Sequence, residues 1–305
     1  MAVAESKTTA LSKSKTSINE LIKNYVILTK PRINALLLFT AYVAAIVAAG
    51  GFPDPVTTLV LVIGLGLSAA GAAVINMWYD RDIDQVMSRT QQRPLPQGII
   101  SSNNALIFGL LLQVLSLIVF LTFSNPVSAL LSFAGFVYYA VIYTMWLKRR
   151  TPQNIVIGGG AGAIPPLVGW AVVTGNVSLG AILMFLVIFF WTPSHFWALA
   201  LYKNDDYKKA KVPMMPVVKG PRVTKIQCMI YGVILSAVSI SLSFIDTLGT
   251  LYLVISILLN VWFLVVHIKL LLEPDNQMKW AKRTFIASLI YLPMLFSLMV
   301  ICVFL

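Results

Sequence analysis

The sequence predicts an all-α membrane protein, a polytopic bundle of nine transmembrane helices with a cytoplasmic N-terminus. Of its 305 residues, 58% are hydrophobic and 11% are charged, and the mean hydropathy is +0.84. A soluble domain carries about 25% charged residues, whereas a membrane-spanning helix needs about 20 mostly apolar ones. Nine such segments occur, at residues 34–52, 56–78, 103–123, 127–147, 154–174, 179–202, 225–245, 249–268 and 284–305.

The placement of the basic residues predicts the orientation. The connections at 52–56, 124–126, 174–178 and 246–248 hold no Lys or Arg, and all 23 fall in the arm 1–33 or in the alternate connections. By the positive-inside rule, the arm and the basic loops face the cytoplasm, and the C-terminus faces outward. The basic residues behind the net charge of +12 then determine the topology and interact with anionic lipid head groups. We therefore expect no nucleic-acid partner, and a single domain, 34–305, in the plasma membrane.

The second span ends in three polar residues, Asn76, Asp80 and Asp84, each four positions apart. On a helix this spacing brings side chains to one face, with Cβ atoms about 5–6 Å apart. Carboxylates close to hydrocarbon are costly, and a divalent cation would offset both that cost and their mutual repulsion. Mg²⁺ favours one or two carboxylates together with substrate phosphate oxygens. The pattern therefore predicts a metal–diphosphate site.

Basic residues accompany this acidic stripe. Arg89 and Arg93 follow it in the same loop, and Arg matches phosphate oxygens in a bidentate fork. Lys148 ends the fourth span on the same side of the membrane, while Lys30 and Arg32 flank the start of the first span. Each is a candidate phosphate contact, although a simple topology signal explains the last three equally well.

A second acidic pair, Asp205 and Asp206, follows the sixth span on the cytoplasmic side. Taken alone it is typical of an ordinary charged loop. Together with the first stripe in the same compartment it predicts a second metal-binding arm, with Asp206 as the first choice and Asp205 beside it.

His195 lies within the sixth span, between Trp191 and Trp197. A lone histidine is most often a hydrogen-bonded core residue, but an ionisable group inside a membrane indicates function. The fifth span begins at Asn154 and continues into a glycine-rich stretch, which permits close approach of helices or of a flat ligand. We expect Pro165 and Pro166, at the end of this stretch, to kink the helix.

The motif Asn-x-x-x-Asp-x-x-x-Asp, met by Asn76, Asp80 and Asp84, is shared by UbiA-type membrane prenyltransferases, which this chain resembles. Longer runs are similar to the branch of that family that farnesylates heme, and they cover residues from about 27 to about 222. These runs are 29–32, 79–84 with 87–95, 148–154, 191–199 and 205–216.

The resemblance implies transfer of the farnesyl group of farnesyl diphosphate to a vinyl group of heme b, giving heme O and diphosphate. It implies Mg²⁺ as cofactor, an apolar chamber that excludes water, and aromatic rings that stabilise an allylic cation. The implied roles are metal binding by Asn76, Asp80, Asp84, Asp205 and Asp206, catalysis by Asp80, Asp84, Tyr139 and Tyr143, and substrate binding by Lys30, Arg32, Arg89, Arg93, Lys148, Asn154, Trp191, His195 and Trp197.

Two positions depart from the family pattern. Ala210 stands where the wider family often has the second carboxylate of an Asp-x-x-x-Asp, so we expect a rearranged second metal arm. Ser194, in the sixth-span run, stands where the family often has a proline. The sequence leaves open whether His195 ligates iron or donates a hydrogen bond, and whether the chain forms a homo-oligomer or works with a heme-modifying enzyme.

Two other functions would also suit a polytopic membrane protein with polar groups of this kind. One is a related prenyltransferase acting on a quinone precursor or a polar lipid, against which the aromatic run around His195 argues. The other is a transporter or channel, which would place polar residues near the midplane of the membrane. The polar groups here gather at one face instead.

Overall fold

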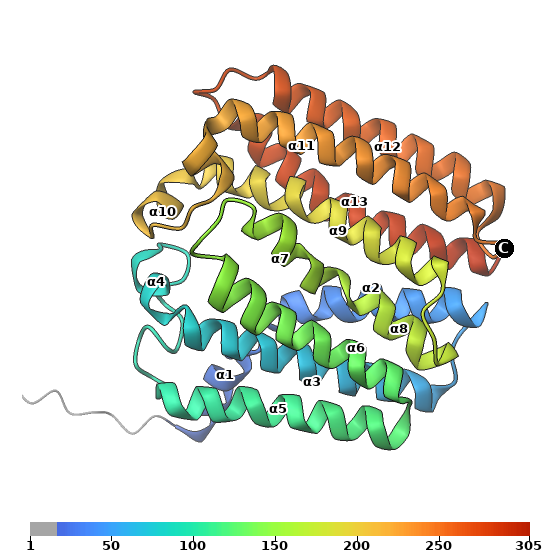
Figure 1. Ribbon diagram of the computed structural model, residues 1–305, viewed down its shortest axis with the longest axis horizontal. Helices are drawn as coiled ribbons and strands as arrows, with labels where there is room; N and C mark the ends of the chain where they lie inside the picture. Colours follow the sequence, from blue (N-terminus) through green and yellow to red (C-terminus); the bar gives the residue numbers. More distant parts are fainter. Residues whose placement is uncertain (1–16) are drawn as a thin grey trace, which may run out of the picture.

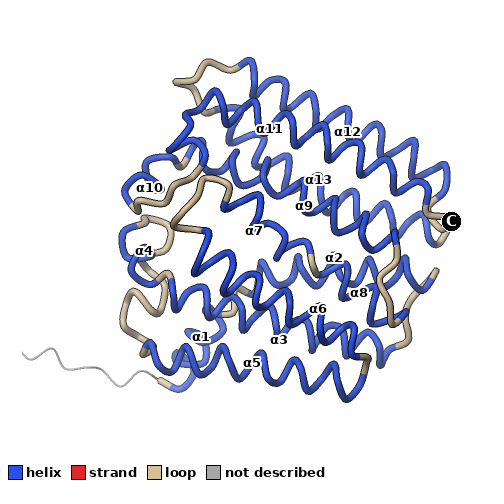
Figure 2. Tube along the Cα trace, viewed as in Figure 1, coloured by secondary structure: helices blue, strands red, loops and turns tan. Residues whose placement is uncertain are grey.

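A computed structural model describes residues 17–305, and its secondary structure is entirely helical in that range (Figure 2). The expected cytoplasmic arm, 1–33, therefore lies partly outside the described residues. The helices are α1 Ile18–Leu28, α2 Pro31–Ala49, α3 Pro55–Tyr79, α4 Arg81–Val86, α5 Ser102–Phe123, α6 Pro126–Val137, η1 Tyr138–Leu147, α7 Asn154–Ala163, α8 Pro165–Thr174, α9 Leu179–Tyr202, α10 Asn204–Lys209, α11 Met215–Ser241, η2 Leu242–Phe244, α12 Gly249–Leu272 and α13 Lys279–Val303.

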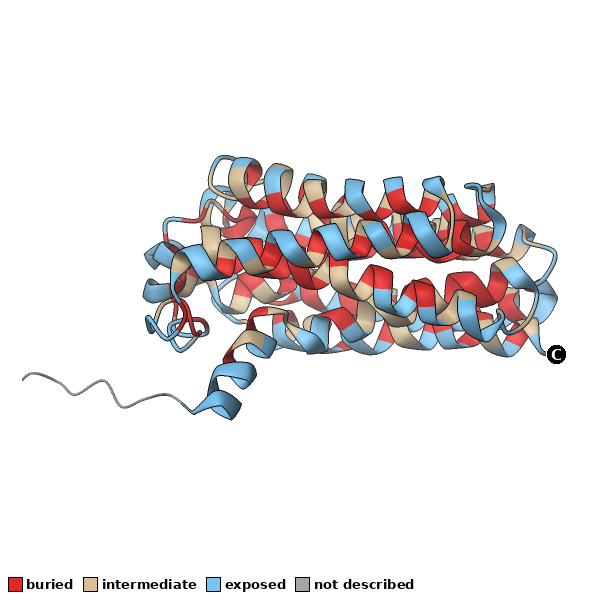
Figure 3. Ribbon diagram, turned by 90° about the horizontal axis from the view of Figure 1, so that it is seen from below, coloured by how far each residue is buried: buried red, intermediate tan, exposed pale blue. Residues whose placement is uncertain are grey.

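The predicted nine-helix membrane bundle is confirmed. Within residues 17–305, nine helical segments are long and apolar enough to cross a bilayer, counting α6 with η1, α7 with α8, and α11 with η2 as single spans. Large apolar side chains such as Ile107, Leu111 and Leu121 of α5 face outward, where a bilayer would cover them. Figure 3 shows exposed residues along the outer surfaces of the helices and buried ones between them.

The seventh span differs from its predicted bounds. It begins at Met215 rather than at residue 225, and its backbone kinks at Gly220, where φ is 80°, ahead of Pro221. Lys225, which hydropathy places at the loop edge, is fully buried; its Nζ donates to the Glu273 carbonyl at 2.7 Å. A span predicted from hydropathy stops at a charged residue. A helix can include that residue when the donors of its side chain have hydrogen-bond acceptors.

The fifth span breaks where its prolines predict. The helix α7 ends at Ala163 and α8 begins at Pro165, with Ile164 between them. Proline lacks the amide hydrogen that the preceding turn would use. The break sets α7 and α8 on separate paths, and α8 packs closely on α2.

The contact between α8 and α2 requires a glycine. A Cβ placed on Gly169 would lie 1.9 Å from the Ala41 carbonyl oxygen of α2. We expect Gly169→Ala to lower the free energy of unfolding by about 1–3 kcal/mol, the usual cost of overpacking a tight interior. Thermal unfolding of purified protein measures it. Gly162→Ala in α7 is the matched control, because no atom outside the local helix backbone lies within 4 Å of its added Cβ. Equal melting of the two variants would contradict the prediction.

The two ends of the bundle differ. Figure 1 shows α1, α4 and α10 at one end, and the C-terminus at the other. The short helices α4 and α10 connect spans at that end, the end that the basic loops predict to be cytoplasmic. The acidic stripe and the second acidic pair both lie there.

Candidate active site

The acidic stripe lies on a nearly continuous helical path at this end. The Asp80 amide donates to the Asn76 carbonyl at 3.0 Å, and the Asp84 amide donates to the Asp80 carbonyl at 2.8 Å, so α3 and α4 join through Asp80. All three side chains are buried, and Asp80 is fully so. The Asn76 carboxamide donates to Asp80 Oδ2 at 2.8 Å, which shows that the spacing of four brings them to one face.

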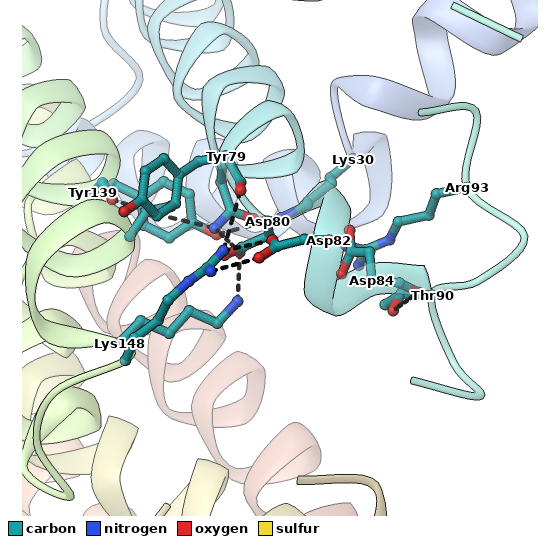
Figure 4. Close-up of polar contacts among 12 residues, drawn as sticks. Lys30, Tyr79, Asp80, Asp82, Asp84, Thr90, Arg93, Tyr139 and Lys148 are labelled. Carbon is teal, nitrogen blue, oxygen red and sulfur yellow. Dashed lines mark hydrogen bonds and ion pairs between the residues drawn. The ribbon is translucent and has the colours of Figure 1, made fainter. Parts of the chain in front are cut away.

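Cations from three separate segments meet this stripe (Figure 4). The ammonium of Lys148, just after η1, donates to Asp80 Oδ2. Arg93, from the loop after α4, pairs with Asp84 Oδ2 at 2.7 Å. Lys30, at the start of α2, donates to Asn76 Oδ1 at 2.6 Å. Three of the five basic residues singled out in the sequence are thus brought together around the carboxylates.

One carboxylate oxygen in this cluster has no hydrogen-bond partner. Asp80 Oδ1 is buried and unpartnered, and the Arg149 guanidinium nitrogen lies 3.7 Å away. Among residues 17–305, no three His, Cys, Asp or Glu side chains gather closely enough to hold a metal by themselves. A site of few carboxylates with a free oxygen fits Mg²⁺, which takes its remaining ligands from substrate phosphates and water.

The cluster around Lys30 carries an excess of positive charge. The pKa of Lys30 is lowered to about 7, chiefly by burial and then by the nearby cations Arg93 and Lys148, while Asp80 and Asp84 oppose the shift. Its backbone is left-handed, with φ 50° and ψ 60°, a conformation that is uncommon outside glycine and is found at functional sites. An anionic ligand among these cations would stabilise their charged forms.

The second acidic segment, which holds Asp205 and Asp206, contacts the loop that follows the acidic stripe. Ser88, in the loop after α4, donates to Asp206 Oδ2 of α10 at 2.8 Å. Burial raises the pKa of Tyr207 of α10, and the charge of the Arg89 guanidinium opposes that shift. The Arg89 side chain itself is exposed. The side chain of Asp205 is exposed and forms no hydrogen bond or ion pair with residues 17–305. The geometry therefore favours Asp206 over its neighbour.

The two tyrosines of the fourth span lie beside the cluster. Their rings, Tyr139 and Tyr143, stack with centroids 5.5 Å apart, and the Lys30 ammonium donates to the Tyr139 hydroxyl at 3.4 Å. They belong to a π-helical segment, a feature frequent at functional sites. A Cβ on Gly158 of α7 would lie 2.1 Å from the Tyr143 ring, so the glycine-rich stretch provides the space for this ring.

His195 and its neighbours form a separate group on α9. His195 stacks on Trp191 with ring centroids 4.2 Å apart, and its Nδ1 is 2.7 Å from the Ser288 hydroxyl of α13. Trp197 is not part of this stack; it is fully buried and meets Tyr231 edge-on at 5.6 Å. The substrate-binding role of Trp197 stays a prediction.

Two further predicted residues differ in their surroundings. Asn154 is fully buried at the start of α7; its amide donates to the Thr151 carbonyl at 2.6 Å, while its Oδ1 has no partner. Arg32 is exposed and forms no hydrogen bond or ion pair with the described part of the chain. The structure thus does not bring Arg32 into the cluster.

Two residues that the sequence does not single out also contact the acidic stripe and its neighbours. Thr144 accepts a hydrogen bond from the Asn76 amide at 3.0 Å, and nothing in its sequence context signals this. Arg149 forms a bidentate pair with Asp82, with both distances 2.7 Å. That hydrogen-bonded pair lowers the pKa of Asp82 and raises that of Arg149. Arg149 directly follows Lys148 in a run of three basic residues, and that run is the sequence signal that points to it.

Relatives of known name cover nearly the whole chain. It is 50% identical over 292 residues to a protoheme IX farnesyltransferase of Symbiobacterium thermophilum, covering 96% of this chain and 98% of the relative. It is 43% identical over 281 residues to a protoheme IX farnesyltransferase of Pelagibacter ubique, covering 90% of this chain and 91% of the relative.

Solved structures agree on the fold. A digeranylgeranylglyceryl phosphate synthase superposes with a TM-score of 0.79 at 20% identity, covering 94% of this chain and 100% of that one. A UbiA homolog from Archaeoglobus fulgidus bound to GPP and Mg²⁺ has a TM-score of 0.64 at 19% identity, covering 90% and 99%. The helical bundle and these relatives define a membrane-embedded transferase. The chain belongs to the UbiA prenyltransferase family, whose sequence model matches residues 37–289.

Proposed function

We propose that this protein transfers the farnesyl group of farnesyl diphosphate to a vinyl group of heme b, giving heme O and diphosphate. The observation that carries the proposal is Asp80, a fully buried carboxylate with one free oxygen, set among Lys30, Arg93 and Lys148. Such a site suits a diphosphate that arrives with its metal. The named relatives at 43–50% identity support heme b as the acceptor.

The reaction begins with loss of the leaving group. The allylic C–O bond breaks, and its electron pair leaves with the diphosphate. Lys30, Arg93 and Lys148 stabilise the negative charge that develops on it. When bound, Mg²⁺ would supply Lewis-acid chemistry to the same oxygens, held by Asn76, Asp80, Asp84 and Asp206.

The second half of the reaction forms a carbon–carbon bond. The terminal vinyl carbon of heme b attacks C1 of the farnesyl cation, which leaves a cation on the vinyl carbon next to the porphyrin ring. Water adds to that carbon and loses a proton, which gives the hydroxyl of heme O. The stacked faces of Tyr139 and Tyr143 lie beside the cluster, where they can stabilise the allylic cation.

The protein is a multi-pass membrane protein, and we place it in the plasma membrane with this site facing the cytoplasm. The basic loops at the end of the bundle that carries α4 and α10 support that orientation. A cysteine-accessibility measurement in intact cells tests it: Ser88→Cys should be protected from an impermeant thiol reagent, and Thr247→Cys at the opposite end should be labelled.

The direct test is an assay of the purified protein with farnesyl diphosphate, Mg²⁺ and one acceptor at a time. We expect a farnesylated, hydrated heme by mass spectrometry with heme b, and no product with an aromatic acid or a glycerol phosphate lipid. Product from either of the latter, and none from heme b, would establish one of the related prenyltransferase activities instead.

A further inference from the structure

Ser288 of α13 links the two aromatic residues of the His195 group. The Trp191 indole N–H donates to the Ser288 carbonyl at 3.0 Å, and His195 Nδ1 lies 2.7 Å from the Ser288 hydroxyl oxygen. Ser288 is fully buried. One residue of α13 therefore fixes the position of two neighbouring rings on α9.

The hydrogen bonds of Ser288 determine which nitrogen of His195 carries the proton. A serine hydroxyl has one hydrogen to donate, and the Ser288 hydroxyl donates it to the Phe285 carbonyl at 2.7 Å. Its oxygen must then accept from His195, which requires the proton on Nδ1. The other tautomer would take the hydroxyl hydrogen away from Phe285 and leave an N–H at Nε2 with no acceptor among residues 17–305.

The ring of His195 is also held in orientation. It lies between Trp191, at 4.2 Å and 16° between planes, and Phe285, at 4.8 Å and 29°. Phe196 meets it edge-on at 5.0 Å. The ring therefore has little freedom to rotate, and its unprotonated nitrogen points in one fixed direction.

We infer that Ser288 is a positioning residue that holds His195 as the Nδ1–H tautomer and so presents Nε2 as a ligand to the heme iron. An imidazole ligand needs a lone pair on the coordinating nitrogen, and a hydrogen bond at the other nitrogen sets both the tautomer and the ligand strength. The inference rests on the proposed function, because it takes heme b as the substrate. It assigns both ring nitrogens of His195: Nδ1 donates its hydrogen bond to Ser288, and Nε2 binds iron instead of donating a hydrogen bond to the porphyrin.

The test measures binding of heme b and of metal-free protoporphyrin IX to the purified full chain, with absorption spectra of ferric and ferrous heme. We expect Ser288→Ala to raise the Kd for heme b about 10-fold or more, as loss of a partner of a metal-ligating histidine does. Its heme spectrum should shift in the direction seen for His195→Ala. The affinity for metal-free protoporphyrin should stay unchanged, since that molecule has no iron to ligate. Ser288→Thr, which keeps the hydroxyl, should restore the wild-type spectrum.

Ser256→Ala on α12 is the matched control, because Ser256 is also buried and its hydroxyl bonds only to a carbonyl of its own helix, that of Leu253, at 3.0 Å. If Ser288→Ala does not fold, Ser288→Cys keeps the volume and replaces the oxygen with a weak acceptor. A wild-type heme spectrum and affinity in the folded Ser288 variant would overturn the inference, as would equal weakening of heme and metal-free porphyrin. An unchanged spectrum in His195→Ala would overturn it too. Failure of the wild-type protein to farnesylate heme b is read separately, from the product assay, and would refute the proposed function.

Discussion

Asp80→Asn should lower kcat about 100-fold or more while leaving the protein folded. The substitution keeps the shape of the side chain and its neighbour Asn76, but it removes the negative charge and the free oxygen Oδ1. Lewis-acid stabilisation of a leaving group is worth several kcal/mol, and each 1.36 kcal/mol is about tenfold in rate. Steady-state kinetics with saturating Mg²⁺ and heme b measure the loss.

Asp82→Asn is the matched control in the same segment. Asp82 is exposed, and its two oxygens pair with the Arg149 guanidinium rather than with the buried cluster. An exposed ion pair is worth at most about 1 kcal/mol, so kcat should fall no more than about fivefold. Comparable losses in the two variants, or an intact product yield in Asp80→Asn, would show that Asp80 has no special part in the reaction.

Lys148→Met should destabilise the protein by about 3–5 kcal/mol, the cost of leaving one member of a buried ion pair without its partner. Asp80 is fully buried and accepts from both Lys148 and Asn76. Removal of the lysine leaves a carboxylate that the Asn76 amide and the Arg149 guanidinium, 3.7 Å from Oδ1, satisfy only in part. Thermal unfolding of purified protein at neutral pH measures the effect, and turnover falls with it because the diphosphate loses a cation.

The double variant Asp80→Asn with Lys148→Met separates stability from catalysis. With both charges gone, most of the stability should return, since coupled residues give non-additive effects. Activity should stay as low as in either single variant. A double variant that unfolds as readily as Lys148→Met would mean that the two side chains are not coupled in the folded protein.

The membrane architecture was predictable because hydrocarbon imposes strict demands. A spanning helix must be long and apolar, so composition alone found all nine spans. The start of the seventh span was predicted wrongly because composition fails where a charged residue is buried. Lys225 is charged and yet buried, because carbonyls of the loop before α13 accept its hydrogen bonds. That loop is about fifty residues away in sequence, and no local pattern reports it.

The site was likewise predictable where it depends on a local pattern in the sequence, and not where it depends on the packing of distant segments. The spacing of Asn76, Asp80 and Asp84 is a property of one helix and could be read directly. The contact from Ser88 to Asp206 depends on how two loops fold over one end of the bundle, 118 residues apart. The part played by Thr144 depends on a π-helical turn, which sequence periodicity does not reveal.

The most direct test of the central claim is anomalous diffraction from crystals grown with Mn²⁺ in place of Mg²⁺ and a thiodiphosphate analogue of farnesyl diphosphate. We expect a Mn²⁺ peak within bonding distance of Asp80 Oδ1, between the stripe on α3 and α4 and Asp206 on α10, with Lys30, Arg93 and Lys148 on the diphosphate. A metal bound elsewhere on the protein, or a diphosphate that contacts none of these cations, would contradict the account.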